Sequence, residues 1–210
     1  MSYHIKEAYY TLQGEGFYTG RAAVFCRFAG CNLWSGYEKD REDATCSFCD
    51  TDFVGVDGPN GGHFDTAEDL AGHISKLWRG NEIKKFVVCT GGEPLLQLDG
   101  SLIDAFHNNN MEIAVESNGT ILPPEGIDWI CVSPKATTEL KIKKGNELKL
   151  VYPQSGCVPD DYIDLDFDHF YLQPMDGERL DENTRSAVEY CLSNPKWKLS
   201  LQTQKILHIN

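Results

Sequence analysis

The sequence is poor in basic residues and contains no long apolar run. Its 19 lysines and arginines stand against 32 aspartates and glutamates, which gives a net charge of −13. A surface this acidic repels phosphate backbones, so we expect no nucleic-acid partner. No stretch approaches 18 consecutive apolar residues, so we expect no membrane-spanning helix and no membrane partner. The first residues, Met1–Glu7, lack the apolar core of a secretory signal, and we therefore expect a cytoplasmic protein.

The rest of the composition is that of an ordinary globular chain. Hydrophobic residues make up 41% and charged residues 24% of the 210 positions, which excludes a disordered or collagen-like protein. A chain of this length can bury roughly 70% of its unfolded surface, enough for a full core. We find no internal repeat and no interdomain linker. The sequence therefore predicts a single domain that spans residues 1–210.

Short apolar segments alternate with helical patterns along the chain. The expected strands are residues 22–28, 86–90, 113–116, 129–132, 148–151, 170–172 and 198–201, and the expected helices are residues 66–78, 101–108 and 182–193. The strands are short, continuous and rich in β-branched or aromatic residues, as strands covered on both faces are. Alternation of strands with helices predicts an α/β fold with a parallel sheet or barrel.

Two connections are too short or too interrupted for a proper crossover helix. Twelve residues separate Glu116 from Trp129, and Pro123 and Pro124 lie among them. A parallel crossover needs about a dozen residues. Pro134 and Gly145 interrupt the next connection in the same way. We therefore predict an incomplete TIM-like (β/α) barrel in which some crossover helices are reduced to loops.

Three of the eight cysteines differ from the others in context. Cys31, Cys46 and Cys49, separated by fourteen and then two residues, lie in a polar, glycine-rich loop of about residues 29–62, here called the cluster loop. Clustered cysteines in a reducing compartment indicate metal binding or catalysis. One interpretation is a zinc site completed by His63. The other is a [4Fe–4S] cluster with one iron left open to a ligand. The cysteines alone leave both interpretations open.

The other cysteines are expected to be ordinary thiols. Cys26, Cys89 and Cys131 lie in apolar strands, Cys191 lies in an expected helix, and Cys157 lies in a loop. Free cysteine is among the most buried residue types, so we expect burial rather than chemistry for the first four.

Polar, glycine or proline residues follow five of the seven expected strands. These segments are Gly30–Cys31, Thr90–Pro94, Glu116–Gly119, Ser133–Lys135 and Gln173–Asp176. In a parallel barrel the carboxyl ends of the strands meet at one mouth, where functional groups collect. Gly91 and Gly92 follow a buried strand directly, so their backbone groups are open to a ligand.

Together these motifs resemble those of the 7-carboxy-7-deazaguanine synthase family, within the radical S-adenosylmethionine (SAM) superfamily. The matching stretches cover the chain from end to end: Leu12–Gly16, Arg27–Leu33, Cys49–Thr51, Thr90–Gln97, Glu116–Thr120, Val132–Lys135, Tyr171–Asp176 and Leu199–Thr203. The superfamily usually has three residues between its first two cysteines. The fourteen found here match one branch of this family.

The resemblance implies a cofactor set and a reaction. It implies that Cys31, Cys46 and Cys49 bind a [4Fe–4S] cluster, that SAM binds the open iron, and that Thr51 helps to hold Mg²⁺. The implied reaction is a carbon–nitrogen lyase reaction of queuosine and related deazapurine biosynthesis. In it, 6-carboxy-5,6,7,8-tetrahydropterin undergoes ring contraction with loss of ammonia to give 7-carboxy-7-deazaguanine. The radical is generated on SAM, so no catalytic side chain is implied. A reducing electron donor of the flavodoxin kind and a homodimer are further implied.

The resemblance also implies the ligand contacts. The implied SAM contacts are Phe48, Cys49, Asp50, Gly92, Glu93, Ser117, Ser133, Pro134, Lys135, Gln173, Pro174, Met175 and Asp176. The implied substrate contacts are Leu12, Gln13, Gly14, Glu15, Arg27, Thr90 and the terminal carboxylate of Asn210. Among these, Glu93 is suited to the SAM ammonium. Arg27 is suited to a carboxylate, and Glu15 to the guanidine-like edge of a pterin.

The chain departs from the family at two positions. Gln204 stands where the family commonly has histidine, and the sequence ends in Asn210 rather than proline. Glutamine can keep a hydrogen bond but cannot carry a proton, so no acid–base role is expected at position 204.

Two alternative functions remain. One is another radical SAM enzyme, such as an activating enzyme that places a glycyl radical on a partner protein. It would use the cysteines and Gly91–Glu93 but would leave Gln13–Glu15, Arg27 and Thr51 unexplained. The other is a zinc-stabilised α/β binding module that uses Cys31, Cys46, Cys49 and His63.

Overall fold

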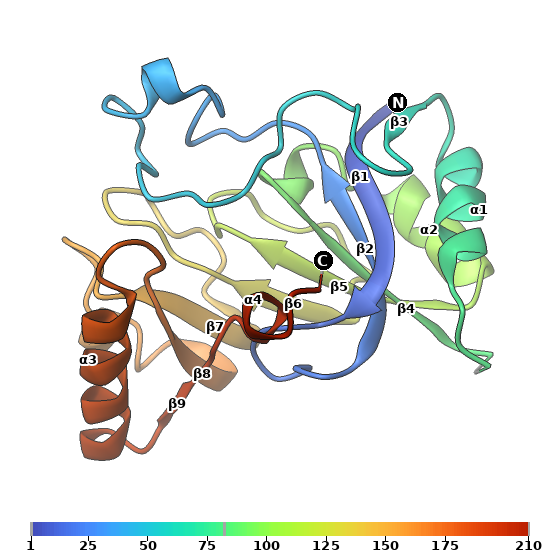
Figure 1. Cartoon of the computed structure of the whole chain (residues 1–210). Coiled ribbons are helices and arrows are strands. Elements are labelled where there is room, and N and C mark those ends of the chain that lie inside the picture. Colours follow the sequence, from blue (N-terminus) through green and yellow to red (C-terminus); the bar gives the residue numbers. More distant parts are fainter. Residues whose placement is uncertain (1, 82, 210) are drawn as a thin grey trace.

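The computed structural model describes residues 2–81 and 83–209 and contains one nine-stranded sheet (Figure 1). Its order is β3-β1-β2-β4-β5-β6-β7-β8-β9. The strands are β1 (Tyr3–Leu12), β2 (Ala22–Phe28), β3 (Gly62–Phe64), β4 (Lys85–Gly91), β5 (Met111–Ser117), β6 (Trp129–Val132), β7 (Lys144–Tyr152), β8 (Asp166–Pro174) and β9 (Trp197–Leu199). From β2 to β9 all neighbours are parallel, whereas β1 is antiparallel to both β2 and β3. Among the described residues no pairing joins β3 to β9, so the barrel is open.

In the described residues, four α-helices accompany the sheet: α1 (Ala67–Leu77), α2 (Gly100–Asn108), α3 (Leu180–Ser193) and α4 (Thr203–Leu207). Figure 1 shows α1 and α2 together on one side of the molecule and α3 on the opposite side. The crossovers from β5 to β6, from β6 to β7 and from β7 to β8 contain no α-helix in this described part of the chain, and only the last has a 3₁₀ turn, Pro159–Asp161. The predicted incomplete TIM-like barrel with crossover helices reduced to loops is confirmed.

The sequence analysis missed three elements. It gave no strand at β1 or β3 and no helix at α4, and it placed the last strand slightly too late. Strand β1 escaped notice because charged residues interrupt its apolar pattern. Lys6 is buried there beside Asp52 and Asp57, and the pairing of β1 with β2 is irregular between Ile5 and Glu7. A buried, paired lysine breaks the simple alternation that predicts a half-buried strand.

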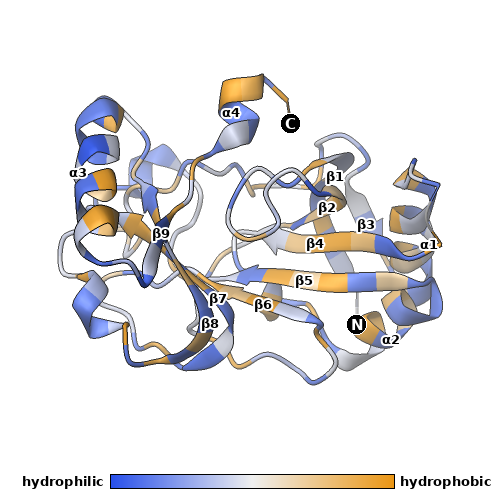
Figure 2. Cartoon of the chain, turned by 90° about the horizontal axis from the view of Figure 1, so that it is seen from below, coloured by the Kyte–Doolittle hydropathy of each residue, from blue (hydrophilic) through white to orange (hydrophobic). Residues whose placement is uncertain are grey.

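The parallel strands are buried on both faces, as their continuous apolar sequences predict. On the outer face, Val87, Ile113 and Val115 pack against the helices in the main core. On the inner face, Phe86 and Ala114 form a second cluster. The loop between β1 and β2 covers this inner cluster with Tyr18 and, nearby, Phe17, which stacks on Trp129 and His169. Orange segments along β4 and β5 mark this apolar centre in Figure 2.

Inner positions change character towards the carboxyl end of each strand. Phe86 and Val88 are followed at the same face by Thr90, and Ala114 is followed by Glu116. Since side chains alternate between faces, these polar residues lie on the inner face, directly after the apolar residues of the inner cluster. The barrel therefore has an apolar base and a polar mouth.

The start of α2 carries a testable stability determinant. Asp99 Oδ1 accepts hydrogen bonds from Leu102 N at 3.0 Å and from the hydroxyl of buried Tyr3 at 2.8 Å. Asp99→Ala removes a helix cap and leaves a buried hydroxyl unpaired, so we expect about 2–4 kcal/mol loss of unfolding free energy. Chemical denaturation measures it. Asp104→Ala, on the exposed face of α2, should change stability by less than about 0.5 kcal/mol; equal losses would contradict this role of Asp99.

Candidate active site

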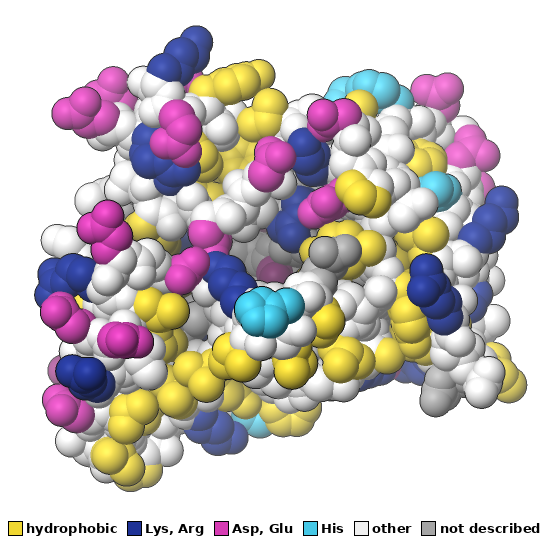
Figure 3. Space-filling model, viewed as in Figure 1, with side chains coloured by type: hydrophobic (Ala, Val, Ile, Leu, Met, Phe, Trp, Pro, Cys, Tyr) yellow, Lys and Arg dark blue, Asp and Glu magenta, His cyan; other side chains and the backbone are white. Residues whose placement is uncertain are grey.

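A cavity of about 560 Å³ opens at the carboxyl ends of the parallel strands. Figure 3 shows this face hollowed at its centre. Its lining includes these residues from the sequence analysis: Leu12, Gln13, Gly14, Glu15, Arg27, Cys46, Phe48, Cys49, Asp50, Thr51, Thr90, Gly92, Ser117, Ser133, Lys135, Gln173, Pro174, Met175 and Asp176. Cys31, Glu93 and Pro134 do not line it. Asn210 lies outside the described residues. The structure thus brings most of the candidates to one mouth.

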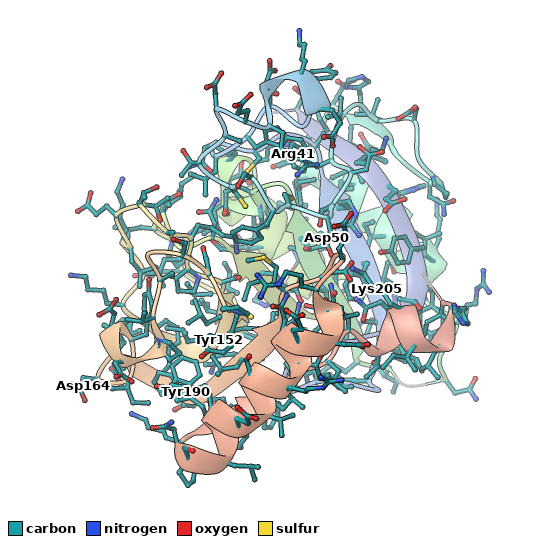
Figure 4. All side chains as sticks on the ribbon, turned by 60° about the vertical axis from the view of Figure 1, so that its left-hand side comes forward. Arg41, Asp50, Tyr152, Asp164, Tyr190 and Lys205 are labelled. Atoms are coloured by element: carbon teal, nitrogen blue, oxygen red, sulfur yellow. The ribbon has the colours of Figure 1, made fainter. Side chains whose placement is uncertain are left out.

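Two cysteines of the cluster loop, Cys46 and Cys49, line the cavity, whereas Cys31 does not. A hydrogen bond from Cys46 lowers the pKa of the Cys49 thiol to about 6, while the same bond and burial raise the pKa of Cys46. Arg41 donates to the carbonyls of Ser47 and Cys49 at 2.8 and 3.0 Å, which fixes the turn between the two thiols (Figure 4). The turn that carries both thiols is therefore held in place by Arg41.

This donor set fits an iron–sulfur cluster better than one metal ion. Within residues 2–81 and 83–209, no three His, Cys, Asp or Glu side chains converge on an ion-sized position. His63, the fourth ligand of the zinc interpretation, lies exposed in β3 and packs edge-on against His4. A cluster places each cysteine on a different iron, so the sulfurs need not converge.

Glycine at position 92 leaves room for the cluster loop. A Cβ there would lie 2.1 Å from the carbonyl oxygen of Gly30 and 2.8 Å from Cβ of Cys31. Gly91, with φ of 134°, passes equally close to Phe28. The paired glycines therefore let the end of β4 pass directly under the first cysteine.

Glu93 braces two strand ends from behind the cavity wall. Its carboxylate is fully buried and accepts hydrogen bonds from Leu95 N at 3.0 Å, Ser117 Oγ at 3.0 and 3.1 Å, and Asn118 N at 2.8 Å. Burial raises the pKa of this carboxyl group. The sequence did not predict this brace. The expected contact of Glu93 with the SAM ammonium stays a prediction.

Arg27 reaches the cavity from the inner face of β2. Its Nε donates to Glu7 at 2.9 Å and its Nη2 donates to the hydroxyl of Tyr9 at 3.0 Å, both from β1. All three residues line the cavity. The guanidinium is therefore held in the wall, with its charge directed at the site.

A charged network forms a further part of the cavity wall. Lys149 Nζ donates to Glu15 Oε2 at 2.5 Å and lies 3.8 Å from Glu116 Oε1. Glu116 also accepts from Gln13 Nε2 at 3.0 Å and from Thr90 Oγ1 at 3.1 Å. The sequence analysis missed Lys149 and gave Glu116 no role. The available signal was a charged residue next to apolar ones within each expected strand, 113–116 and 148–151.

The chain end crosses the mouth of the cavity. Lys205 donates to Asp50 and to Asp176, each at 2.6 Å, and so joins the cluster loop to the end of β8 (Figure 4). Gln202 Nε2 and Gln204 Nε2 both donate to Glu15 Oε1 at 3.0 Å. The missed helix α4 therefore belongs to the site, and no signal in its short sequence marks it.

An open parallel (β/α) barrel with three cysteines after its first parallel strand and Gly-Gly-Glu after the next defines a radical SAM enzyme. The enzyme family implies a [4Fe–4S] cluster and SAM. The three cysteines of the cluster loop, and the space that Gly91 and Gly92 leave beside them, fit these groups. No protein-family model matches the chain.

Relatives of known function match the chain over its full length. A 7-carboxy-7-deazaguanine synthase of Bradyrhizobium diazoefficiens is 58% identical over 209 residues, which is 100% of both chains. One of Caulobacter vibrioides is 59% identical over 207 residues, which is 99% of both. The crystal structure of QueE from Escherichia coli matches with a TM-score of 0.67 at 24% identity, over 96% of this chain and 94% of that one, and supports the fold. The chain belongs to the 7-carboxy-7-deazaguanine synthase family.

The close approach at Gly92 gives a test of the cluster site. Gly92→Ala places a methyl group against Gly30 and Cys31, so the cluster loop must shift. We expect at least a twofold drop in iron and sulfide bound per chain after anaerobic reconstitution, measured by elemental analysis and visible absorbance. Gly72→Ala in α1, where a Cβ meets nothing within 4 Å, serves as the control and should bind iron normally. Normal iron content in both variants would refute the role of Gly92 in making room for the cluster loop.

Proposed function

We propose that the enzyme converts 6-carboxy-5,6,7,8-tetrahydropterin to 7-carboxy-7-deazaguanine by Mg²⁺-dependent ring contraction with loss of ammonia. The observation that carries the proposal is full-length identity of 58–59% to 7-carboxy-7-deazaguanine synthases. It is supported by a single cavity that holds thiols, Arg27 and Glu15 together. We propose one catalytic domain over residues 1–210.

The chain's own groups divide into two sets around this cavity. Cys31, Cys46 and Cys49 would hold the cluster, which together with SAM supplies the one-electron chemistry when bound. Ser133–Lys135 and Gln173–Asp176, at the ends of β6 and β8, would hold SAM against it. Lys135 is suited to this place because its ammonium, held by Ser133 at 2.6 Å, faces the thiols and balances their charge.

The opposite wall would orient the pterin. Arg27, always charged and able to bind two oxygens at once, would hold the substrate carboxylate. Glu15 would accept from the guanidine-like edge, with Leu12, Gln13, Gly14 and Thr90 around it. Since Lys205 and its partners cross the mouth, the chain end would keep bulk water from the reacting centre.

Thr51 would hold Mg²⁺ together with substrate oxygens and water. Thr51 lines the cavity, as do its neighbours Asp50 and Asp52. Mg²⁺ is a hard ion that keeps several waters and accepts few protein ligands, so one hydroxyl beside ligand oxygens is a suitable partner.

We further propose a homodimer, a flavodoxin-like electron donor and a cytoplasmic location. The eight cysteines are all free thiols, which suits a reducing compartment. Leu180, Val188 and Leu192 are exposed at helical spacing on α3, which supports a subunit interface. Sedimentation would test the dimer. In the described part of the chain, no helix is long and apolar enough to span a membrane.

The proposed reaction is tested by anaerobic reconstitution with iron and sulfide, followed by incubation with dithionite, SAM, Mg²⁺ and the tetrahydropterin. We expect 7-carboxy-7-deazaguanine by mass spectrometry, with ammonia released in equal amount. SAM cleavage without conversion of the pterin would favour another radical SAM reaction and refute the substrate. A colourless protein that retains zinc would refute the cluster as well.

The Mg²⁺ assignment has its own test. Thr51→Ala removes the hydroxyl, so we expect the Mg²⁺ concentration that gives half-maximal turnover to rise by about 10-fold or more. Thr51→Ser keeps the hydroxyl and should respond to Mg²⁺ nearly as the parent does. An unchanged Mg²⁺ response in Thr51→Ala would remove Thr51 from the metal site.

A further inference from the structure

A lysine is buried in the cavity wall, on strand β7. Lys149 lies on the inner face of β7 between Leu148 and Leu150, which point outward into the main core. Its side chain is only 7% exposed, and it lines the cavity. Its Nζ contacts Glu15 at 2.5 Å and faces Glu116 at 3.8 Å. A buried ammonium in a substrate wall requires an explanation, because its desolvation is costly.

The groups around Lys149 come from five parts of the chain. The titratable groups that face it are Glu15 after β1, Glu116 on β5, Cys131 on β6, Lys135 after β6 and Glu147 on β7. Burial lowers the pKa of Lys149, but the charges of Glu116 and Glu15 outweigh it and hold that pKa above its usual value. Lys149 is therefore a cation at neutral pH.

The reverse effect acts on Glu15. Burial raises the pKa of this carboxyl group, but the charge of Lys149 and its hydrogen bond, together with Gln202 and Gln204, bring it down to about 2. The two amides come from the chain end and are neutral, so Lys149 is the cation that keeps this buried carboxylate ionised. It also holds Oε2 from a rigid strand.

Ionisation of Glu15 decides what that carboxylate can recognise. An ionised carboxylate only accepts hydrogen bonds, and it has about four acceptor sites. Three are taken by Lys149, Gln202 and Gln204, which leaves a place for a donor of the ligand. An amino group on the ligand ring can donate this hydrogen bond. A carbonyl group in the same place cannot, and its oxygen would be repelled by the carboxylate oxygen of Glu15. A protonated Glu15 would reverse the preference.

We propose that Lys149 is a positioning residue that sets substrate specificity. By holding Glu15 in place as an anion, it makes the site accept a pterin with a 2-amino group and reject the 2-oxo analogue. This inference rests on the proposed function, because it takes Glu15 as the partner of the pterin edge.

The test compares two stable, fluorescent probes on the reconstituted enzyme with SAM. These are pterin-6-carboxylate and lumazine-6-carboxylate, which carries a 2-oxo group instead of the 2-amino group. Fluorescence titration gives both dissociation constants. We expect the parent to prefer the pterin by at least about 10-fold, since a hydrogen bond to a charged group is among the stronger ones. In Lys149→Met the ratio should fall to about 1 or invert.

Control variants separate this role from general damage. Lys144→Met, at the exposed start of the same strand, should keep the parental ratio. In a Glu15→Gln background, Lys149→Met should change the ratio no further, because its effect passes through Glu15. The double variant removes both partners of the Lys149–Glu15 pair, so Glu15 is not left as a buried carboxylate without its cation. If Lys149→Met does not fold, Lys149→Gln replaces it in the same comparison.

Each result decides the proposal. A parental ratio retained in Lys149→Met would overturn the role of Lys149 and leave the proposed reaction standing. An equal fall of the ratio in the parental and Glu15→Gln backgrounds would also overturn it, because Lys149 would then act through another group. A parent without preference would remove Glu15 from the pterin edge and the inference with it, while the turnover assay judges the reaction separately.

Discussion

The alternation of side chains along parallel strands is the constraint on which the structure depends. Every strand from β2 to β8 must bury one set of side chains against the helices or loops outside the sheet, and the other set points inward. The inner set is apolar at the base, where Phe86 and Ala114 meet the loop between β1 and β2. It becomes polar at the mouth, with Thr90, Glu116 and Lys149. A shift of one residue in the pairing of a strand would turn its core side chains inward and its site side chains outward.

The hydrogen bonds of Glu93 meet a second requirement of the parallel sheet. Parallel strands have no hairpin to fix the relation of their carboxyl ends, so these ends must be tied by side chains. Glu93 joins the end of β4 to the end of β5 through Ser117 and Asn118. On the other side of the cavity, Lys205 joins the cluster loop to the end of β8 through Asp50 and Asp176. One tie is buried and the other spans the open mouth.

Much of this was available from the sequence. Continuous apolar segments located all seven parallel strands, although β7 and β8 each extend several residues beyond the expected range. Pro123 and Pro124 correctly excluded a helix before β6. The strand-end segments located one part of the cavity lining, including Thr90, Ser117 and Gln173. The elements that the sequence analysis missed depend on contacts between residues far apart in the sequence, or are very short. Lys6 in β1 is tolerated because of Asp52 and Asp57, some fifty residues away, and α4 is too short for any periodic pattern. Local residue patterns do not encode such partners.

The glutamine at position 204 can be understood from the same network. A histidine at this position would bring a titrating group to Glu15. Here Gln204 and Gln202 both reach the same carboxylate oxygen as neutral donors, and the cation comes from Lys149 on the strand behind. The ionisation of Glu15 therefore does not depend on a titrating group in the chain end. Neutral amides suffice to dock that end over the site, while the charge balance of the wall stays within the rigid sheet.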